Sequence, residues 1–399
     1  MTAPNTSAAP TPRMPRAIWA LGFVSLLMDV SSELIHSLLP VFMFTALGIS
    51  AFSIGLIEGA AEATALIVKV FSGVLSDWWG KRKPLAVLGY GLGALSKPLF
   101  AIAGGAGLIV TARLMDRVGK GIRGAPRDAL VADITPPQMR GAAFGLRQSL
   151  DTVGAFLGPL MAMGLMLLWA NDFRAVFWVA VIPAFLAVAL LIFGVQEPER
   201  KAEGARVNPI RRENLRRLPV AYWWVVAIGA IFTLARFSEA FLVLRAAEGG
   251  LPLAYTPLVL IAMNVVYAAS AYPLGKLADS TSHAGLLAAG LVVLIAADAA
   301  LAWDGHWLAV WLGVVLWGLH LGMTQGLLAA MIADTAPADL RGTAYGFFNL
   351  ASGIALLVAS ALAGLLWDSF GAEFTFVAGG AFAAAALFAI ISRQADRQA

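Results

Sequence analysis

Long stretches of apolar residues, separated by short polar segments, follow one another along the whole chain. Three of these stretches, 175–195, 249–275 and 342–367, contain no charged residue. A helix of about 20 apolar residues spans the hydrocarbon core of a bilayer, so each stretch is long enough to cross a membrane. Applied to the whole chain, this criterion predicts twelve membrane-spanning helices, over 17–47, 52–76, 84–104, 107–132, 144–169, 173–195, 219–246, 253–278, 284–303, 307–333, 343–367 and 373–392.

The composition agrees with this prediction. Of the 399 residues, 60% are hydrophobic and 13% are charged, whereas soluble domains are about half apolar and a quarter charged. The absence of cysteine excludes a disulfide-stapled secreted protein and any cysteine-ligated metal site. The predicted fold class is therefore an all-α integral membrane protein in contact with the lipid bilayer.

The basic residues predict the orientation of the chain. They gather in alternate loops, at Arg13 and Arg16, at 81–83, in the 196–218 segment and near the C-terminus, while the other loops are mainly acidic. By the positive-inside rule, both termini then lie in the cytoplasm of a bacterium, with the chain crossing its cytoplasmic (inner) membrane many times. These basic loop residues also account for the net charge of +4, so we expect no nucleic-acid partner.

Two sequence segments recur at nearly the same offset. Residues 140–145 resemble 341–346 at an offset of 201 (341 minus 140), and 73–77 resemble 275–279 at an offset of 202 (275 minus 73). Duplicated halves with a binding site between them are typical of secondary transporters. The predicted organisation is an N-terminal tail, a six-helix bundle, a cytoplasmic linker, a second six-helix bundle and a C-terminal tail, over 1–16, 17–195, 196–218, 219–392 and 393–399.

The loop after the second predicted helix carries a family motif. Residues 73–85 match the pattern G-x-L-[AS]-D-x-x-G-[KR]-[KR]-x-x-L, and this resembles the signature of the major facilitator superfamily. The resemblance implies two pseudo-symmetric six-helix bundles that rock against each other, with this loop as a conformational latch at the level of the lipid head groups. The residues assigned to the latch are Gly73, Asp77, Gly80, Lys81 and Arg82, together with Asp279 in the degenerate second copy.

Two further motifs are similar to those of the same family. In the fourth predicted helix, the family's motif is an arginine followed four residues later by glycine, and two registers compete: Arg117 has Gly121 four residues later, whereas Arg113 lies deeper in the helix but has Arg117 at that place. We assign Arg113 as the buried residue and Arg117 as a partner of acids. In the fifth helix, Gly154, Gly158 and Pro159 resemble the G-x-x-x-G-P motif of the family's antiporters; the glycines permit close helix packing.

Ionisable residues within the predicted helices point to proton coupling. They are costly in a membrane and normally serve a function there, and a carboxyl group in a dry cavity can carry a proton near neutral pH. Asp29, Glu33 and His36 share one helix face, and Glu58, Glu62 and Lys69 share another. The predicted proton-coupling residues are Asp29 and Glu33 first, Glu58 and Glu62 second, with Arg113 as the base. A static ion pair between Glu62 and Lys69 is an equally good interpretation of the helix face that carries Glu58, Glu62 and Lys69.

The remaining polar residues in the predicted helices are assigned to a substrate cavity. They are His36, Arg117, Gln148, Asp151, Arg236, Glu239, Asn264, His320 and Gln325. A metal site at His36 is disfavoured because only Glu33 accompanies it, and no cofactor is expected.

Together these patterns predict a secondary transporter. No P-loop motif is present, so ATP does not drive it. Proton-coupled export of a small molecule by a monomer is favoured; uptake of an anionic metabolite, using Arg236 and Arg245, is the alternative. A membrane sensor or an intramembrane enzyme is disfavoured, because neither an output domain nor a catalytic constellation is evident.

Overall fold

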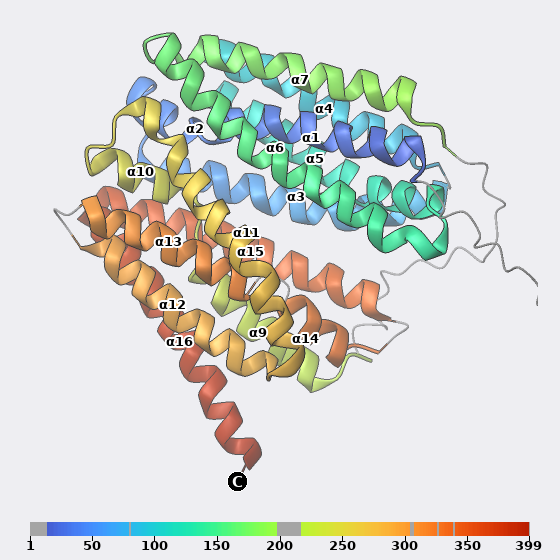
Figure 1. Ribbon diagram of the computed structural model, residues 1–399. Coiled ribbons are helices and arrows are strands. Elements are labelled where there is room, and N and C mark those ends of the chain that lie inside the picture. Colours follow the sequence, from blue (N-terminus) through green and yellow to red (C-terminus); the bar gives the residue numbers. More distant parts are fainter. Residues whose placement is uncertain are drawn as a thin grey trace, which may run out of the picture.

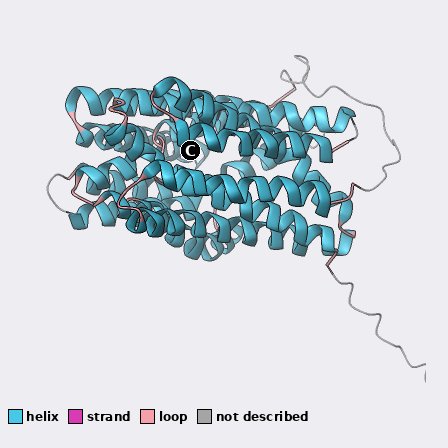
Figure 2. Cartoon of the chain, turned by 90° about the horizontal axis from the view of Figure 1, so that it is seen from above, coloured by secondary structure: helices cyan, strands magenta, loops and turns pink. Residues whose placement is uncertain are grey.

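The computed structural model describes residues 14–79, 81–197, 217–303, 307–324, 327–337 and 340–398. Within these ranges the regular secondary structure is helical, without strands (Figures 1 and 2). The first half contains α1 (Arg16–His36), α2 (Leu39–Val41), a short π-helical segment (Phe42–Ala46), α3 (Ala51–Trp79), α4 (Lys83–Ile102), α5 (Ala106–Ile134), a 3₁₀ turn (Pro137–Met139), α6 (Arg140–Leu168) and α7 (Phe173–Gly194).

The second half contains a similar series of helices. These are α9 (Val220–Leu234), α10 (Ala240–Glu248), a 3₁₀ turn (Leu253–Tyr255), α11 (Pro257–Ser280), α12 (His283–Ala302), α13 (Trp307–Thr324), α14 (Leu327–Thr335), α15 (Arg341–Phe370) and α16 (Ala372–Gln398). The helices of each half pack mainly with one another, and the two halves lie side by side (Figure 1).

The predicted fold class is confirmed. Ten helical segments in the described chain are long and apolar enough to cross a membrane. The strongly charged α5 and the pair α9 and α10 complete the predicted series of twelve. Most of the predicted linker, 198–216, lies outside the described residues.

The first and seventh predicted spans are interrupted within the described residues. The first is interrupted between α1 and α2, where Pro40 has no backbone N–H to continue the helical hydrogen bonds. The seventh is broken at 235–239, where the backbone N–H of Ser238 bonds to the Ser360 hydroxyl of α15 at 3.1 Å. The break exposes backbone and polar side chains near the middle of the span, which membrane proteins tolerate where protein or water surrounds them.

The apolar core is arranged differently at the two ends of the molecule. At the end that holds the 47–50 and 249–252 loops, buried residues from both halves form one cluster. Near residues 14 and 217, each half also has a separate cluster, and the shared cluster reaches this part of the second half through Leu286 and Ile390. The cores of the halves are therefore joined at the first end, and the contact between the halves continues toward the other end, where a Cβ added at Gly346 would lie 3.1 Å from Val70.

Helices α3 and α15 form a close contact between the halves. A Cβ atom added at Gly55 would lie 2.0 Å from the Ser360 carbonyl oxygen, and one at Gly364 would lie 2.3 Å from that of Ala51. At the joined end, the Asp368 carboxylate accepts hydrogen bonds of 3.0 and 2.8 Å from the N–H groups of Ala51 and Phe52, at the start of α3. A carboxylate at a helix N-terminus is favourable because it meets free N–H groups and the positive end of the helix dipole.

This contact gives a first testable prediction. We expect Gly55→Ala to destabilise the protein by about 1–3 kcal/mol, because an added methyl group overpacks the α3–α15 contact. The control is Gly91→Ala in α4, where an added Cβ meets no atom within 4 Å and helix propensity favours alanine. Thermal unfolding in detergent measures both variants, and an equal midpoint for the two would contradict the close packing.

Candidate functional site

A network of charged side chains lies inside the first half, where α1, α3, α4 and α5 meet. Helix α5 positions it: Arg113, Asp116, Arg117 and Arg123 of this helix are all buried. Glycines on other sides of α5 allow the close approach of its neighbours, since a Cβ at Gly119 would lie 2.5 Å from the Gly89 carbonyl oxygen of α4. The charged face of α5 is thus held against the polar residues of the surrounding helices.

Arg113 joins three elements of this network. Its guanidinium donates hydrogen bonds to the Glu58 carboxylate of α3 and to Nε2 of His36 in α1, and it lies 3.8 Å from Oε1 of Glu62. The sequence predicts Asp29 and Glu33 as the first acids to pair with Arg113, whereas the structure gives it Glu58. The α3 acids therefore lie closer to the predicted base than the α1 acids do.

Arg117 lies one turn further along α5 and links Glu62 to His36. Its Nη1 is 3.2 Å from Oε1 of Glu62, and its Nη2 is 3.1 Å from Nδ1 of His36. The suggested Glu62–Lys69 pair is not the arrangement observed: among the described residues, the cations within 4 Å of Glu62 are Arg113 and Arg117, and Lys69 is exposed. Nδ1 of His36 also lies 3.7 Å from Oε1 of Glu33, so His36 connects Arg117 to this acid of α1.

A lysine–aspartate pair at the base of the network was not assigned from the sequence. Lys97 of α4 is fully buried, and its Nζ donates to Oδ1 of Asp116 at 2.7 Å and to the Ser32 hydroxyl at 3.0 Å. Asp116 also lies 3.5 Å from Nε2 of His36. A lysine in an apolar span needs a charged partner. The presence of Lys97 in α4 could therefore have indicated a buried acid on a neighbouring helix, and that acid is Asp116.

The charges are arranged in two layers. Arg113 and Arg117 are each only 3% exposed, whereas the side chains of Asp29, Glu33 and Glu62 are 27%, 28% and 33% exposed. The carboxylates thus lie on the accessible side of the network and the guanidinium groups behind them. Asp29 has Arg123 at 3.9 Å.

The predicted packing motif of α6 lies directly behind the two acids of α1. A Cβ at Gly154 would lie 3.0 Å from that of Asp29, and a Cβ at Gly158 would lie 2.9 Å from that of Glu33. Pro159 is buried within α6 and leaves that helix unbroken. The absence of side chains at the two glycines therefore brings α6 against the backbone that carries the acids.

The polar residues at the start of α6 form a separate group. The Arg147 guanidinium donates to the Asp151 carboxylate and, at 3.1 Å, to the Gln148 side-chain oxygen, and it lies 3.8 Å from Asp128. Gln148 is exposed and Asp151 is half-buried. These residues lie closer to the end that holds residues 14 and 217, since Ala143 of α6 belongs to the separate cluster of the first half at that end.

The second half contributes the residues at the break between α9 and α10. Glu239 is exposed, Arg236 and Asn264 are half-buried, and the Arg236 guanidinium lies 5.4 Å from the centre of the Phe232 ring. Among charged groups, Glu239 interacts most strongly with Arg236, and it is also within electrostatic range of Glu33 and Glu62 of the first half. The break in the seventh span therefore faces the charged network of the first half.

Three substrate-cavity or transport assignments need correction or fall outside the structure. His320 is fully buried, with Nδ1 2.8 Å from the Gly290 carbonyl oxygen of α12, so it packs within the second half and lines no accessible space. Arg245 is buried and donates to the carbonyl oxygens of Leu301 and Trp303 at 2.9 and 3.2 Å, which fixes the end of α12. Gln325 lies outside the described residues.

The structure describes some of the residues of the predicted conformational latch. Lys81 is exposed and Arg82 is buried: Nε of Arg82 lies 3.0 Å from Oδ2 of Asp133, and its backbone N–H donates to the Glu197 carboxylate. The carboxylates of these two residues hold Arg82 inward. A Cβ at Gly73 would lie 3.4 Å from Ala125 of α5. Gly80, and the side chains of Asp77 and Asp279, lie outside the described residues.

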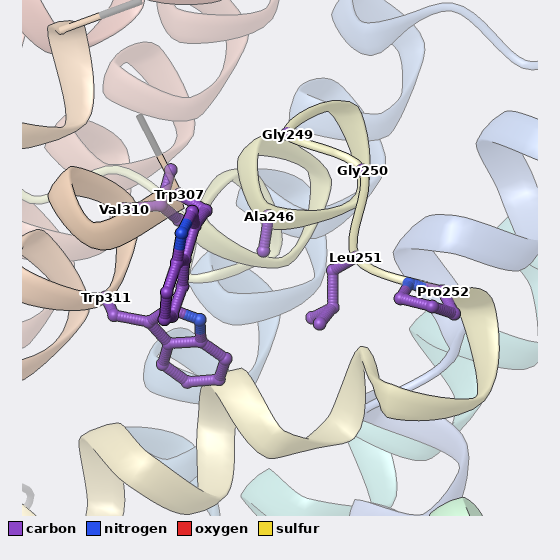
Figure 3. Close-up of a pocket in the computed structure, with 8 residues that line it drawn as sticks. All are labelled: Ala246, Gly249, Gly250, Leu251, Pro252, Trp307, Val310 and Trp311. Atoms are coloured by element: carbon purple, nitrogen blue, oxygen red, sulfur yellow. The ribbon is translucent and has the colours of Figure 1, made fainter. Parts of the chain in front are cut away.

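A small pocket of about 140 Å³ lies away from the charged network, beside α10 and α13 (Figure 3). Its lining is apolar, with Leu251 and Pro252 on one side and the Trp307 and Trp311 rings on the other. None of the predicted site residues borders it. Within the described ranges, no group of three histidine, cysteine, aspartate or glutamate residues could hold a metal ion.

Comparison with known proteins agrees with this architecture. The family model described as Major Facilitator Superfamily matches residues 21–359 and 244–398. The uncharacterized MFS-type transporter MJ1317 of Methanocaldococcus jannaschii is 32% identical over 374 residues, which cover 92% of each chain. The inner membrane transport protein YajR of Escherichia coli is 25% identical over 386 residues, covering 94% of this chain and 82% of that protein.

A solved structure shows the same fold at low sequence identity. The crystal structure of the nucleoside transporter NupG superposes with a TM-score of 0.76 and 12% identity, covering 95% of this chain and 99% of that one. The family model spans nearly the whole chain, and the relatives match both halves. The chain belongs to the Major Facilitator Superfamily, and it is a multi-pass membrane protein of the secondary transporter type.

Proposed function

We propose that this protein exports a small molecule across the cytoplasmic membrane of a bacterium in exchange for protons. The observation that carries the proposal is the network in which accessible carboxylates of α1 and α3 lie against buried arginines of α5. Such an arrangement binds a proton readily when a guanidinium moves away from a carboxylate, and releases it when the guanidinium returns. Glu62 with Arg117 has the geometry for this exchange, at 3.2 Å and at the accessible edge of the network.

The position of the network supports coupling to movement of the halves. Glu62 lies on α3, the helix that packs against α15 of the second half, and Glu239 of the second half is within its electrostatic range. A rocking motion that changes the α3–α15 contact therefore alters the surroundings of the Glu62 carboxylate. Protonation and access to the site then depend on each other, as alternating access requires.

The direction of transport rests on two features. The α6 motif at Gly154–Pro159 resembles that of antiporters, and it packs directly against the backbone of Asp29 and Glu33. The basic loops assign both termini to the cytoplasm. With that orientation, the separate clusters of the two halves lie on the cytoplasmic side, which supports entry of the substrate from that side.

A growth assay in a bacterium that lacks its main exporters tests this function. We expect the wild-type protein to raise the tolerated concentration of at least one toxic compound about fourfold or more, and Asp29→Asn and Glu62→Gln to abolish that increase. The matched control is Glu248→Gln, an exposed carboxylate of α10 that lies outside the network and bonds Arg245 at 3.2 Å.

Two results of this assay would contradict the proposed function. Equal tolerance in cells with and without the protein, across a broad panel of compounds, would overturn export. Full resistance in both network variants would show that the carboxylates do not couple transport to protons. Comparing solute movement in vesicles with the proton gradient imposed in each direction distinguishes export by exchange from proton-coupled uptake.

A further inference from the structure

One carboxyl group of the second half is buried without a hydrogen-bond partner. Asp298 of α12 is 1% exposed, and neither of its carboxyl oxygens has a partner among the described residues. Buried polar groups in proteins are nearly always hydrogen-bonded, so an exception of this kind requires an explanation. The proton exchange proposed at Glu62 does not involve this residue.

The packing of α12 on α13 repeats that of α4 on α5. A Cβ atom added at Gly89 of α4 would lie 2.7 Å from the Gly119 carbonyl oxygen, and one at Gly290 of α12 would lie 3.8 Å from Nδ1 of His320. Both members of this contact differ by 201 residues between the halves (290 minus 89, and 320 minus 119), which is also an offset of the sequence repeat. The same register therefore relates these four helices.

In this register the counterpart of Asp298 is Lys97 (298 minus 97). Lys97 is paired with Asp116 of α5 at 2.7 Å, and the counterpart of Asp116 is Trp317 of α13 (317 minus 116), which is 1% exposed. The position that supplies the partner charge in the first half is thus occupied by an uncharged ring in the second. The repeat explains why Asp298 is buried without a cation.

The Asp298 carboxyl group lies beside the break in the seventh span. A Cβ added at Gly379 of α16 would lie 2.8 Å from Oδ2 of Asp298 and 2.9 Å from Cε1 of Phe237, so the carboxyl group and the Phe237 ring meet at this glycine. Phe237 is in the break at 235–239 and is 4% exposed. Its ring packs, at centroid distances of 5.6, 5.4 and 5.6 Å, on the rings of Phe241, Trp317 and Phe376. The broken span therefore covers the acid with aromatic rings.

No charged group in the described part of the chain compensates Asp298. On the elements around α12, the titratable and charged residues are His320, Asp334, Arg236, Glu239, Arg245, Glu248, Glu373, Arg393, Asp396 and Arg397. Two of them are bonded elsewhere, Arg245 to the Leu301 carbonyl oxygen and His320 to that of Gly290. An ionised carboxylate needs water, hydrogen-bond donors or a cation, and a carboxylic acid in an apolar setting needs them far less.

The surroundings suit a proton better than a metal ion. A cation such as Ca²⁺ takes six or more oxygen ligands, whereas the groups that meet the Asp298 carboxyl group at Gly379 are a glycine and an aromatic ring. Within the described ranges, no group of three histidine, cysteine, aspartate or glutamate residues could hold a metal ion. A single proton on one carboxyl oxygen needs no further ligand.

We propose that Asp298 is a second proton-binding residue, which keeps its proton while the break at 235–239 covers it and releases the proton to water when the break moves. The O–H bond of the acid is broken, the proton passes to water, and a hydrated carboxylate remains. Because only the hydrated form is stable when ionised, ionisation and movement of the break favour each other. The part that Asp298 plays in exchange rests on the proposed transport function, and its release does not occur in a variant whose transport cycle is stopped at Glu62.

Infrared spectra of the purified full-length protein in lipid membranes test whether Asp298 holds a proton. The carbonyl stretch of a carboxylic acid differs in frequency from the bands of a carboxylate. At neutral pH we expect Asp298→Asn to lose intensity in the acid band and none in the carboxylate bands. The control is Glu248→Gln, which removes an exposed carboxylate of α10 and should lose intensity in the carboxylate bands alone.

A single introduced thiol tests the link to the break. The chain contains no cysteine, so Ser238→Cys places one thiol in the break, and its rate of reaction with a water-soluble maleimide reports access of water. The rate is divided at each pH by that of Ser238→Cys combined with Asp298→Asn, which cancels the pH dependence of the thiol itself. We expect this ratio to be near one in acid and to rise in alkali by up to about tenfold per pH unit, as the ionised fraction of the Asp298 carboxyl group does.

The outcomes separate this proposal from the function on which it rests, since neither measurement involves a solute. Loss of carboxylate rather than acid intensity in Asp298→Asn, or a labelling ratio that is the same at every pH, would overturn the proposal and leave export standing. Both results as expected, without resistance in the growth assay, would overturn export and leave the proton site standing. If Asp298→Asn does not fold, Asp298→Leu replaces it in both measurements, because an uncharged buried group without partners can be exchanged for an apolar one.

Discussion

Replacing Lys97 with methionine is expected to destabilise the protein by about 3–5 kcal/mol, because the change leaves the buried Asp116 carboxylate without its closest cation. Lys97 is fully buried and lies 2.7 Å from Asp116. The expected result is a large fall in the midpoint of thermal unfolding and in the yield of folded protein. Lys69→Met is the matched control, since Lys69 is an exposed lysine of α3, and its effect should remain within about 0.5 kcal/mol.

A double variant tests the reason for this loss. Lys97→Met combined with Asp116→Leu removes both buried charges, and replacing a buried ion pair by apolar residues is often nearly neutral for stability. We expect the double variant to recover most of the midpoint lost in Lys97→Met but to remain inactive in the growth assay. A double variant as unstable as the single one would show that the pair is not the origin of the effect.

Replacing Arg113 with methionine is expected to reduce transport to the level of cells without the protein. Arg113 is the residue through which α5 contacts both α1 and α3, by way of His36 and Glu58. Its loss leaves the buried Glu58 carboxylate without its hydrogen-bonded cation, so we expect the contacts of α5 with both neighbouring helices to weaken. We expect Arg113→Lys, which keeps the charge but lacks the planar donor geometry, to retain less than about one tenth of the activity.

The measurement for Arg113 separates a transport defect from a folding defect. Initial rates of solute movement in vesicles are divided by the amount of folded protein in the membrane, determined for each variant. The second variant for comparison is Arg174→Lys, since Arg174 lies at the start of α7 and donates to the Ala103 carbonyl oxygen at 3.1 Å. Wild-type rates in Arg113→Lys would contradict a role for the planar donor geometry, and wild-type rates in Arg113→Met would remove Arg113 from the mechanism.

Hydropathy predicts the fold of this chain because the bilayer permits few alternatives. A spanning segment must satisfy its backbone internally, so apolar stretches of sufficient length become helices. The same rule misses the interruption at 235–239, since no proline or glycine marks it and the Ser238 N–H finds a partner on a distant helix, at Ser360. Such a break depends on tertiary contacts that local sequence does not contain.

The sequence predicts the residue types of the candidate site but not their pairing. Sequence spacing shows that Asp29 and Glu33 share a helix face, but it does not show which face of α5 meets that face. The rotation of α5 is fixed by close packing at Gly119 and Gly121, and it directs Arg113 to Glu58 instead. The assignment of His320 is wrong for a related reason: a polar residue in a span can be satisfied by a neighbouring backbone carbonyl, here that of Gly290.

The exchange of protons for solute is measured most directly in vesicles that contain the purified protein and an internal pH indicator. The solute is the compound to which the protein confers resistance, added outside without any imposed gradient. The account predicts that entry of the solute raises the internal pH, that an acidic interior accelerates entry, and that Glu62→Gln abolishes the pH change. Solute entry at an unaltered internal pH, at a rate independent of the proton gradient, would contradict it.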